Sequence, residues 1–146
     1  MDRLALAPGL RAQFEREARA AFPRECCGLI EGVREGNEYR VRALHPTRNL
    51  AADADRFEVD PAAHLTLQRR LRGTGRAVLG CYHSHPNGAA WPSVWDGGHD
   101  GDFVWLIAGL DAGGIRAVSA HLRVGASWEA LELAPSQLDP SPGPTL

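Results

Sequence analysis

A short apolar run that ends in two histidines constrains the fold of this chain more than any other feature. Residues Ala77–Tyr82 are bounded by turn residues, which is typical of a buried strand. The chain then continues directly into His83-Ser84-His85-Pro86. Because side chains alternate between the two faces of a strand, His83 and His85 are predicted to share one face. The chain is therefore expected to build a sheet in which one strand ends with two neighbouring imidazoles.

The rest of the pattern predicts a mixed α/β fold with two helices. Apolar residues recur at helical spacing after Pro8 and predict a helix over residues 9–21. Asp60-Pro61 supplies a cap and a first turn for a second helix that contains Leu65, Leu67 and Leu71. Residues 45–55 are predicted to form a polar loop. The sheet is expected to have about six strands, with antiparallel hairpins late in the chain, among the segments 4–6, 26–31, 39–43, 57–59, 77–82, 103–110, 115–124 and 128–133.

Length and composition indicate one globular domain. The 146 residues are enough for a single core, which we place at residues 1–133, and residues 134–146 hold four prolines and are predicted to form a disordered tail. The net charge of −2 gives no indication of nucleic-acid binding, and no apolar run approaches the ~18 residues of a membrane span. The three cysteines, two of them adjacent, do not form a disulfide framework, so a cytoplasmic location is expected.

The two histidines and a later aspartate have the composition of a catalytic zinc site. Asp96 follows His85 after ten intervening residues, a loop long enough to bring its carboxylate back to the imidazoles. Two histidines and one carboxylate leave the fourth tetrahedral position for water, as in catalytic rather than structural zinc sites. The alternative is a pair of solvent-facing histidines at a strand end.

Several segments together resemble a known family. In consistent order over about residues 20–125, they resemble the JAMM (MPN-plus, Mov34/PAD-1-like) zinc metalloproteases, and within these the small stand-alone bacterial branch. The segments that carry the resemblance are Pro23–Gly32, Phe57–Pro61, Gly80–Pro86, Pro92-Ser93 and Asp96. The resemblance implies a mixed, curved β-sheet flanked by helices, which is the MPN fold and is similar to that of cytidine deaminases.

The resemblance also implies a role for five residues. His83, His85 and Asp96 would bind one zinc ion per chain. Glu25 would hold and deprotonate the zinc-bound water, which fits the need of a zinc hydrolase for a neighbouring general base. Ser93 would stabilise the oxyanion, a contribution of about 3 kcal/mol for one good donor.

The substrate class is likewise implied by the resemblance. It would be the amide that joins the C-terminal Gly-Gly tail of a ubiquitin-like protein to an amine, as in a deubiquitinase. In bacteria the corresponding partners would be ubiquitin-like sulfur-carrier proteins. Trp91 and Trp95 flank Ser93, and indole rings on a loop beside a metal would line a substrate groove. Packing of a long loop explains these two rings equally well.

Other interpretations concern the same residues. A catalytically inactive MPN-type scaffold is the non-enzyme alternative, and a zinc deaminase is disfavoured because the H-x-E and P-C-x-x-C elements are missing. The three cysteines are interpreted as small buried strand residues rather than nucleophiles, and Cys81 also as an accessory ligand on the metal face. Ser84 is expected to point to the opposite face, in a structural role. A loop, a helix surface and a strand are the places expected for His45, His64 and His121.

Overall fold

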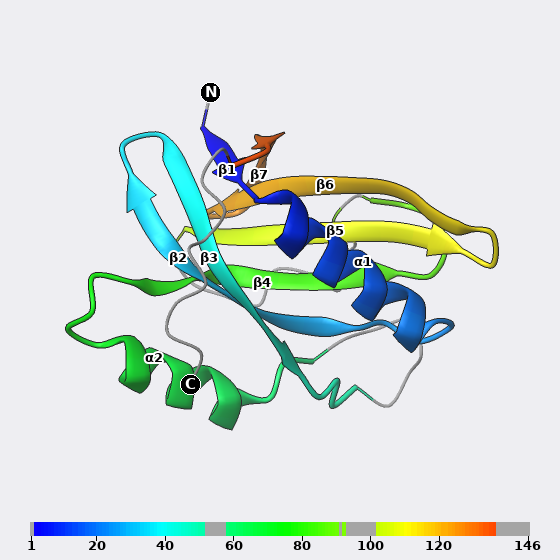
Figure 1. Cartoon of the computed structure of the whole chain (residues 1–146), viewed down its shortest axis with the longest axis horizontal. Coiled ribbons are helices and arrows are strands. Elements are labelled where there is room, and N and C mark those ends of the chain that lie inside the picture. The colour runs from blue at the N-terminus through cyan, green and yellow to red at the C-terminus, as the bar shows by residue number, and fades with distance from the viewer. Residues whose placement is uncertain (1, 52–57, 91, 93–101, 137–146) are drawn as a thin grey trace.

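The computed structural model describes residues 2–51, 58–90, 92 and 102–136. These residues form two helices and seven strands (Figure 1). The elements are β1 (Arg3–Ala5), α1 (Pro8–Ala21), β2 (Cys27–Glu35), β3 (Glu38–Thr47), α2 (Pro61–Leu71), β4 (Ala77–His85), β5 (Phe103–Asp111), β6 (Gly114–Val124) and β7 (Ser127–Ala134).

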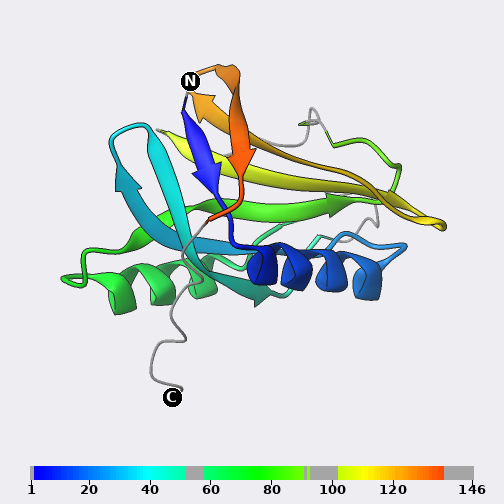
Figure 2. The same ribbon diagram turned by 45° about the horizontal axis from the view of Figure 1, so that its top comes forward.

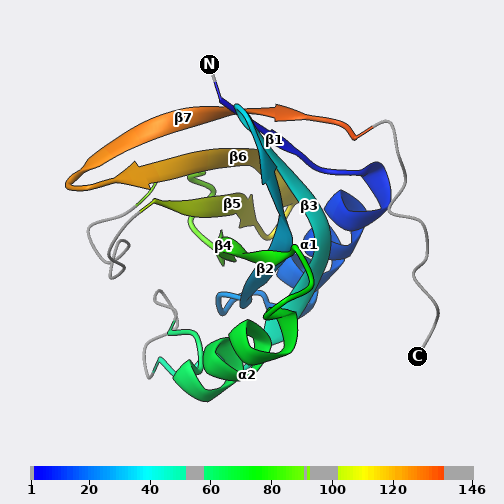
Figure 3. The ribbon, with the colours of Figure 1, turned by 90° about the vertical axis from the view of Figure 1, so that its left-hand side faces the viewer.

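The strands form one mixed sheet that closes on itself in the order β1-β3-β2-β4-β5-β6-β7. Figure 3 shows the strands curling around the molecule. Strand β4 runs parallel to β5, whereas β5, β6 and β7 form the antiparallel hairpins expected late in the chain. The expected number of about six strands is corrected, because the described residues form seven. The sheet closes because β1 pairs in parallel with both β3 and β7.

Both helices lie where the sequence predicts them. Pro8 occupies the first turn of α1, and this helix ends at Ala21. The side chain of Asp60 accepts a hydrogen bond of 2.9 Å from the Ala62 amide and thereby caps α2, whose first residue is Pro61. Each helix buries one apolar stripe, as the 3.6-residue period requires.

The helices cover opposite faces of the sheet, as neighbouring residues of β2 show. Ile30 belongs to the main core, together with Phe14 of α1. The adjacent Leu29 points the other way and packs with Leu67 and Leu71 of α2. Figure 2 shows the two helices apart from one another, with the green α2 toward the left of the view and the blue α1 toward the right. The sheet thus has an α1 face and an α2 face.

Strand β3 extends further than the sequence predicts. His45 pairs with Leu29 and Thr47 pairs with Cys27, so the first residues of the expected 45–55 loop belong to the sheet. Pro46 is tolerated there because β1 pairs only with residues 38–40 of β3 and leaves this end of the strand at an edge. In place of the expected strand at 57–59, the described residues show one isolated bridge between Val59 and Asn49. Residue 57 lies outside the described part.

Two further observations concern the whole of the described chain. None of its helices is long and apolar enough to cross a membrane. Cys26, Cys27 and Cys81 are all described and form no disulfide, as expected. Residues 137–146, most of the expected tail, lie outside the described part.

Candidate metal centre

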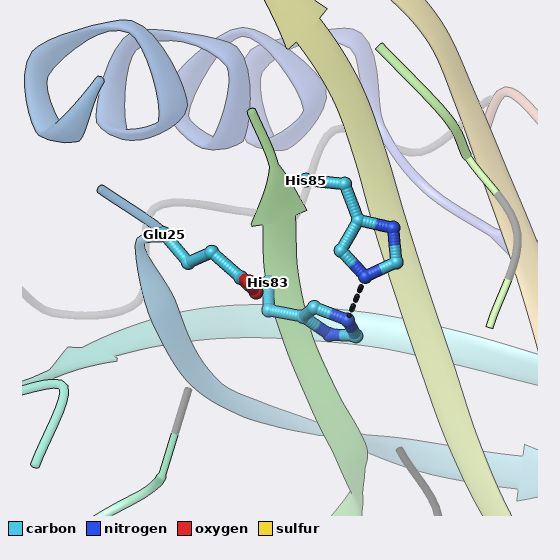
Figure 4. Close-up of side chains that lie close together, drawn as sticks. All are labelled: Glu25, His83 and His85. Atoms are coloured by element: carbon cyan, nitrogen blue, oxygen red, sulfur yellow. Dashed lines mark hydrogen bonds between the residues drawn. The ribbon is translucent and has the colours of Figure 1, made fainter. Parts of the chain in front are cut away.

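Three residues that the sequence singles out come together at one end of the sheet. His83 and His85 are the last part of β4, and Glu25 lies just before β2 (Figure 4). The antiparallel register pairs Cys27 with His83, so the residues that precede β2 lie beside the end of β4. This register, and not proximity in sequence, brings Glu25 to the two histidines.

The polar atoms of the three side chains converge. The Nε2 atoms of His83 and His85 are 2.9 Å apart, and the rings lie edge to face with centroids 4.7 Å apart. One carboxylate oxygen of Glu25 and one nitrogen of each imidazole all lie within 4.8 Å of one another. Exposure is 4% for Glu25, 0% for His83 and 6% for His85. The cluster is therefore a buried group of three possible ligand atoms.

A backbone carbonyl orients one of the imidazoles. The Nδ1–H of His85 donates to the carbonyl oxygen of Ala89 at 3.1 Å. With Nδ1 as the donor, Nε2 keeps its lone pair and faces the cluster, which is the arrangement that a metal-binding histidine needs. On the other side of the cluster, the ring of Trp105 packs edge-on against His83, with centroids 5.7 Å apart. The aromatic ring keeps this side of the site apolar.

The donor set fits a zinc ion. Two imidazole nitrogens and a carboxylate are ligands that Zn²⁺ accepts, and the two nitrogens already point at one another. His83 and His85 would hold the ion. A buried carboxylate at the distance of Glu25 can either bind the ion or act as a base beside it.

The cysteines near the site are unsuited to nucleophilic chemistry. Burial raises the pKa of Cys26 to about 12 and also raises the pKa of Cys27. Both thiols are therefore protonated at neutral pH, and the thiol is a poor nucleophile. Cys81 lies on the same face of β4 as His83, but it packs in an apolar cluster with Phe103 and Trp105.

Some of the remaining residues singled out from the sequence are described by the structure and some are not. Asp96, Ser93, Trp91 and Trp95 all lie outside the described residues. Ser84 accepts a hydrogen bond from the backbone of Cys26, which agrees with a structural role. The other histidines that the structure describes are His45 in β3, His64 on α2 beside the ring of Phe103, and His121, which is buried in β6.

Two hydrogen-bond networks were not predicted from the sequence. His45 and Arg76 each donate a 2.8 Å hydrogen bond to the buried carboxylate of Glu31. Ser119 and His121 of β6 both contact the carbonyl of Ala90, close to the metal centre. The only signal for the second network is the spacing of two residues, which places a serine and a histidine on one face of a strand.

A pocket of about 530 Å³ opens next to Glu25. It lies between the last turn of α1 and the adjoining ends of β2 and β3, and its lining includes Cys26, Cys27 and Pro46. Among the described residues its lining includes Glu25 but neither His83 nor His85, so the pocket adjoins the cluster at Glu25.

Comparison with known proteins identifies the family. The model that describes prokaryotic homologs of the JAB domain matches residues 8–121. The chain belongs to this family. A desampylase of Haloferax volcanii is 30% identical to this JAB-domain protein over 145 residues, which cover 91% of the present chain and 96% of the relative. A probable TtuB-protein conjugate cleaving protease of Thermus thermophilus is 37% identical over 87 residues, or 59% of this chain and 53% of that protein.

A solved structure agrees with this assignment. The solution structure of a protein from Desulfitobacterium hafniense has a TM-score of 0.80 and 28% identity, covering 93% of this chain and 95% of that one. The fold is the JAB1/MPN fold, and the resemblance to small JAMM proteins is confirmed. The JAB-domain protein is an enzyme, a JAMM-type isopeptidase, which disfavours both the scaffold and the deaminase alternatives.

Proposed function

We propose that this JAB-domain protein is a zinc-dependent isopeptidase that hydrolyses an amide at the C-terminal Gly-Gly tail of a ubiquitin-like sulfur-carrier protein. The observation that carries the proposal is the buried convergence of His83, His85 and the Glu25 carboxylate within 4.8 Å. Two relatives, a desampylase and a probable conjugate-cleaving protease, support the substrate class.

The residues of the site have distinct tasks in this proposal. His83 and His85, completed by Asp96, hold the zinc ion. When bound, zinc makes a water molecule acidic near neutral pH and polarises the carbonyl of the amide. Ser93 donates a hydrogen bond to the carbonyl oxygen on which negative charge develops.

Glu25 moves the proton. Its carboxylate takes the proton from the attacking water and passes it to the nitrogen of the leaving amine. Without that second transfer the amine would have to leave as an anion. Burial of Glu25 and its closeness to both imidazoles support this task, since a base must lie within reach of the water it activates.

The tail is proposed to bind extended beside the metal. Glycine lets the backbone approach the site closely, because it has no side chain to accommodate. Trp91 and Trp95 are proposed as walls of the groove that holds the tail. The pocket next to Glu25 is proposed to receive the amine side of the substrate.

The proposal is tested with synthetic tails that end in Gly-Gly, Gly-Ala and Gly-Val amides, incubated with the zinc-loaded protein and analysed by mass spectrometry. Only the Gly-Gly amide should be cleaved, and a chelator should abolish the cleavage. Equal cleavage of all three tails would replace the Gly-Gly specificity with a general zinc peptidase. Cleavage that persists in the chelator would remove the zinc mechanism.

A further inference from the structure

The short segment that follows β4 is held by hydrogen bonds at two consecutive carbonyls. The Ala89 carbonyl accepts from His85 Nδ1, as described above. The Ala90 carbonyl accepts a hydrogen bond from the Ser119 hydroxyl and lies 3.2 Å from the Nε2 of His121. Ser119 and His121 are also bonded to each other at 2.7 Å, and both Ala90 and His121 are buried. Two side chains of strand β6 thus hold the backbone that immediately follows the Ala89 carbonyl, and this carbonyl orients the ring of His85.

The backbone of the same segment also packs closely against strand β5. Gly109 is the β5 residue that pairs with His85 of β4. A Cβ atom on Gly109 would collide with the carbonyl oxygen of Gly88 and would lie 2.7 Å from the carbonyl carbon of Ala89. Real Cβ atoms essentially never approach backbone so closely. The backbone of residues 88–89 therefore occupies the space that a side chain would fill at this position.

From these contacts we infer that Gly109, Ser119 and His121 are positioning residues of the metal centre. They clamp the Gly88–Ala90 backbone and so fix the Ala89 carbonyl that orients His85. This inference rests on the proposed metal role of His83 and His85. The contacts given above are with the backbone of this segment, so the three residues are inferred to act on the site through His85.

The contacts argue against a separate serine–histidine nucleophile. In such a dyad the histidine accepts the serine proton, but here the Ser119 hydroxyl donates its only proton to the Ala90 carbonyl. His121 then contributes an Nε2–H that points to the same carbonyl and to the Ser119 oxygen. Both side chains are committed to holding backbone.

The clamp is expected to act on zinc affinity. If the Ala89 peptide can rotate, His85 loses the partner that fixes its tautomer and ring orientation, and its Nε2 is no longer held toward the ion. Removing a partner of this kind from a metal-binding histidine typically costs about 10- to 100-fold in metal affinity. Gly109→Ala and Ser119→Ala act on the same segment from two different strands, so both should weaken zinc binding.

The experiment measures the zinc dissociation constant of the whole protein by competition with a chromogenic chelator. Ser119→Ala should raise this constant by about 10-fold, and Ser119→Thr, which keeps the hydroxyl, should restore it to within about threefold of the wild type. Ser127→Ala, an exposed serine on β7, is the matched control and should behave as the wild type.

Gly109→Ala gives an independent reading of the same clamp. It should also raise the zinc dissociation constant, whereas Gly9→Ala should leave it unchanged, because nothing lies within 4 Å of the Cβ position of Gly9. Visible spectra of the cobalt-substituted proteins should differ from the wild type for Ser119→Ala and Gly109→Ala, and match it for the two controls.

The outcomes separate this inference from the proposed function. A wild type that binds no zinc overturns both the metal centre and the clamp. A wild type that binds zinc, with unchanged zinc affinity and cobalt spectra in Ser119→Ala and Gly109→Ala, overturns the clamp alone. Melting temperatures of the metal-free proteins are measured in parallel. If the variants melt lower but the folded proteins bind zinc as the wild type does, Gly109 and Ser119 are merely structural and the inference fails.

Discussion

The backbone amide of Cys26 donates a hydrogen bond of 2.8 Å to the hydroxyl of Ser84. The amide of Ser84 donates in return to the carbonyl of Cys26 at 3.2 Å. Cys26 follows Glu25 directly, and Ser84 lies between the two histidines of β4. This reciprocal pair therefore fixes the carboxylate of the site relative to the imidazoles.

Ser84→Ala tests the importance of this pair. The variant leaves the Cys26 amide without its hydroxyl acceptor, and an unsatisfied buried donor costs about 1–3 kcal/mol. We expect the free energy of unfolding to fall by that amount and zinc to be retained. The turnover number should fall while KM changes little, because Glu25 loses part of its positioning. Denaturant unfolding and steady-state kinetics measure both effects, and unchanged values would show that the backbone bond alone is sufficient.

His85→Ala should abolish zinc binding. The side chain supplies one of the two facing nitrogens, and without it the proposed site keeps only His83 and Asp96, fewer than the three protein ligands that a catalytic zinc ion needs. Elemental analysis of the purified protein should find near 1:1 zinc in the wild type and almost none in the variant, with activity lost in parallel. His64→Ala, on α2, is the matched control and should keep its zinc. Full zinc content in the His85 variant would refute the ligand assignment.

Glu25→Gln should separate metal binding from turnover. The amide has nearly the same size as the carboxylate but cannot accept a proton. We expect zinc content and KM to stay close to the wild type while the turnover number falls by about 10²- to 10⁴-fold, the usual contribution of a general base. Glu35→Gln removes a side chain that is 58% exposed and should be silent. Near-normal turnover in the Glu25 variant would make this residue a bystander.

Local sequence was sufficient to predict both helices and most strands. Pro8 and Asp60-Pro61 mark helix starts by chemistry that acts within one turn, and alternation along β4 places His83 and His85 on one face. The closed barrel could not be predicted in this way. It depends on the three-residue β1 pairing with strands that lie more than thirty and more than one hundred residues away in the sequence.

The same limit applies to the site. Taken alone, Glu25 is a charged residue before a strand and suggests a surface position, yet it is buried beside His83. Its place depends on the β2–β4 register, which no local pattern reveals, so only the family resemblance pointed to it. His45 was expected in a loop because its neighbours are polar. It belongs to β3, where it pairs with Leu29 of β2 and its side chain contacts the carboxylate of Glu31.

Acid should destabilise the protein partly through Glu31. Burial opposes ionisation of this carboxyl, but hydrogen bonds from Arg76 and His45 outweigh it, so the pKa of Glu31 lies below its ordinary value. A depressed pKa in the folded state means that the unfolded chain binds protons more readily. The stabilisation from Glu31 is therefore complete above the unfolded pKa of about 4.3 and is lost as the pH falls through the folded pKa.

Glu31→Gln measures this contribution. The free energy of unfolding of the wild type should decline below about pH 4.5, and the variant should show a shallower decline, because it has no carboxyl to protonate at this position. Denaturant unfolding at several pH values between 7 and 3 gives both curves. Glu35→Gln again serves as the control for the loss of an exposed carboxyl. Parallel curves for the wild type and Glu31→Gln would show that this network carries no acid-linked stability.

Strand β1 has a consequence for how the protein can be handled. Its three residues bind β3 on one side and β7 on the other, and Leu4 and Ala5 are buried. Displacing this one short strand would uncover backbone donors and acceptors on two strands at once, and uncovered strands recruit the strands of other molecules. A tag or fusion that strains residues 3–5 would thus make the protein self-associate, and a flexible spacer before Arg3 would protect it.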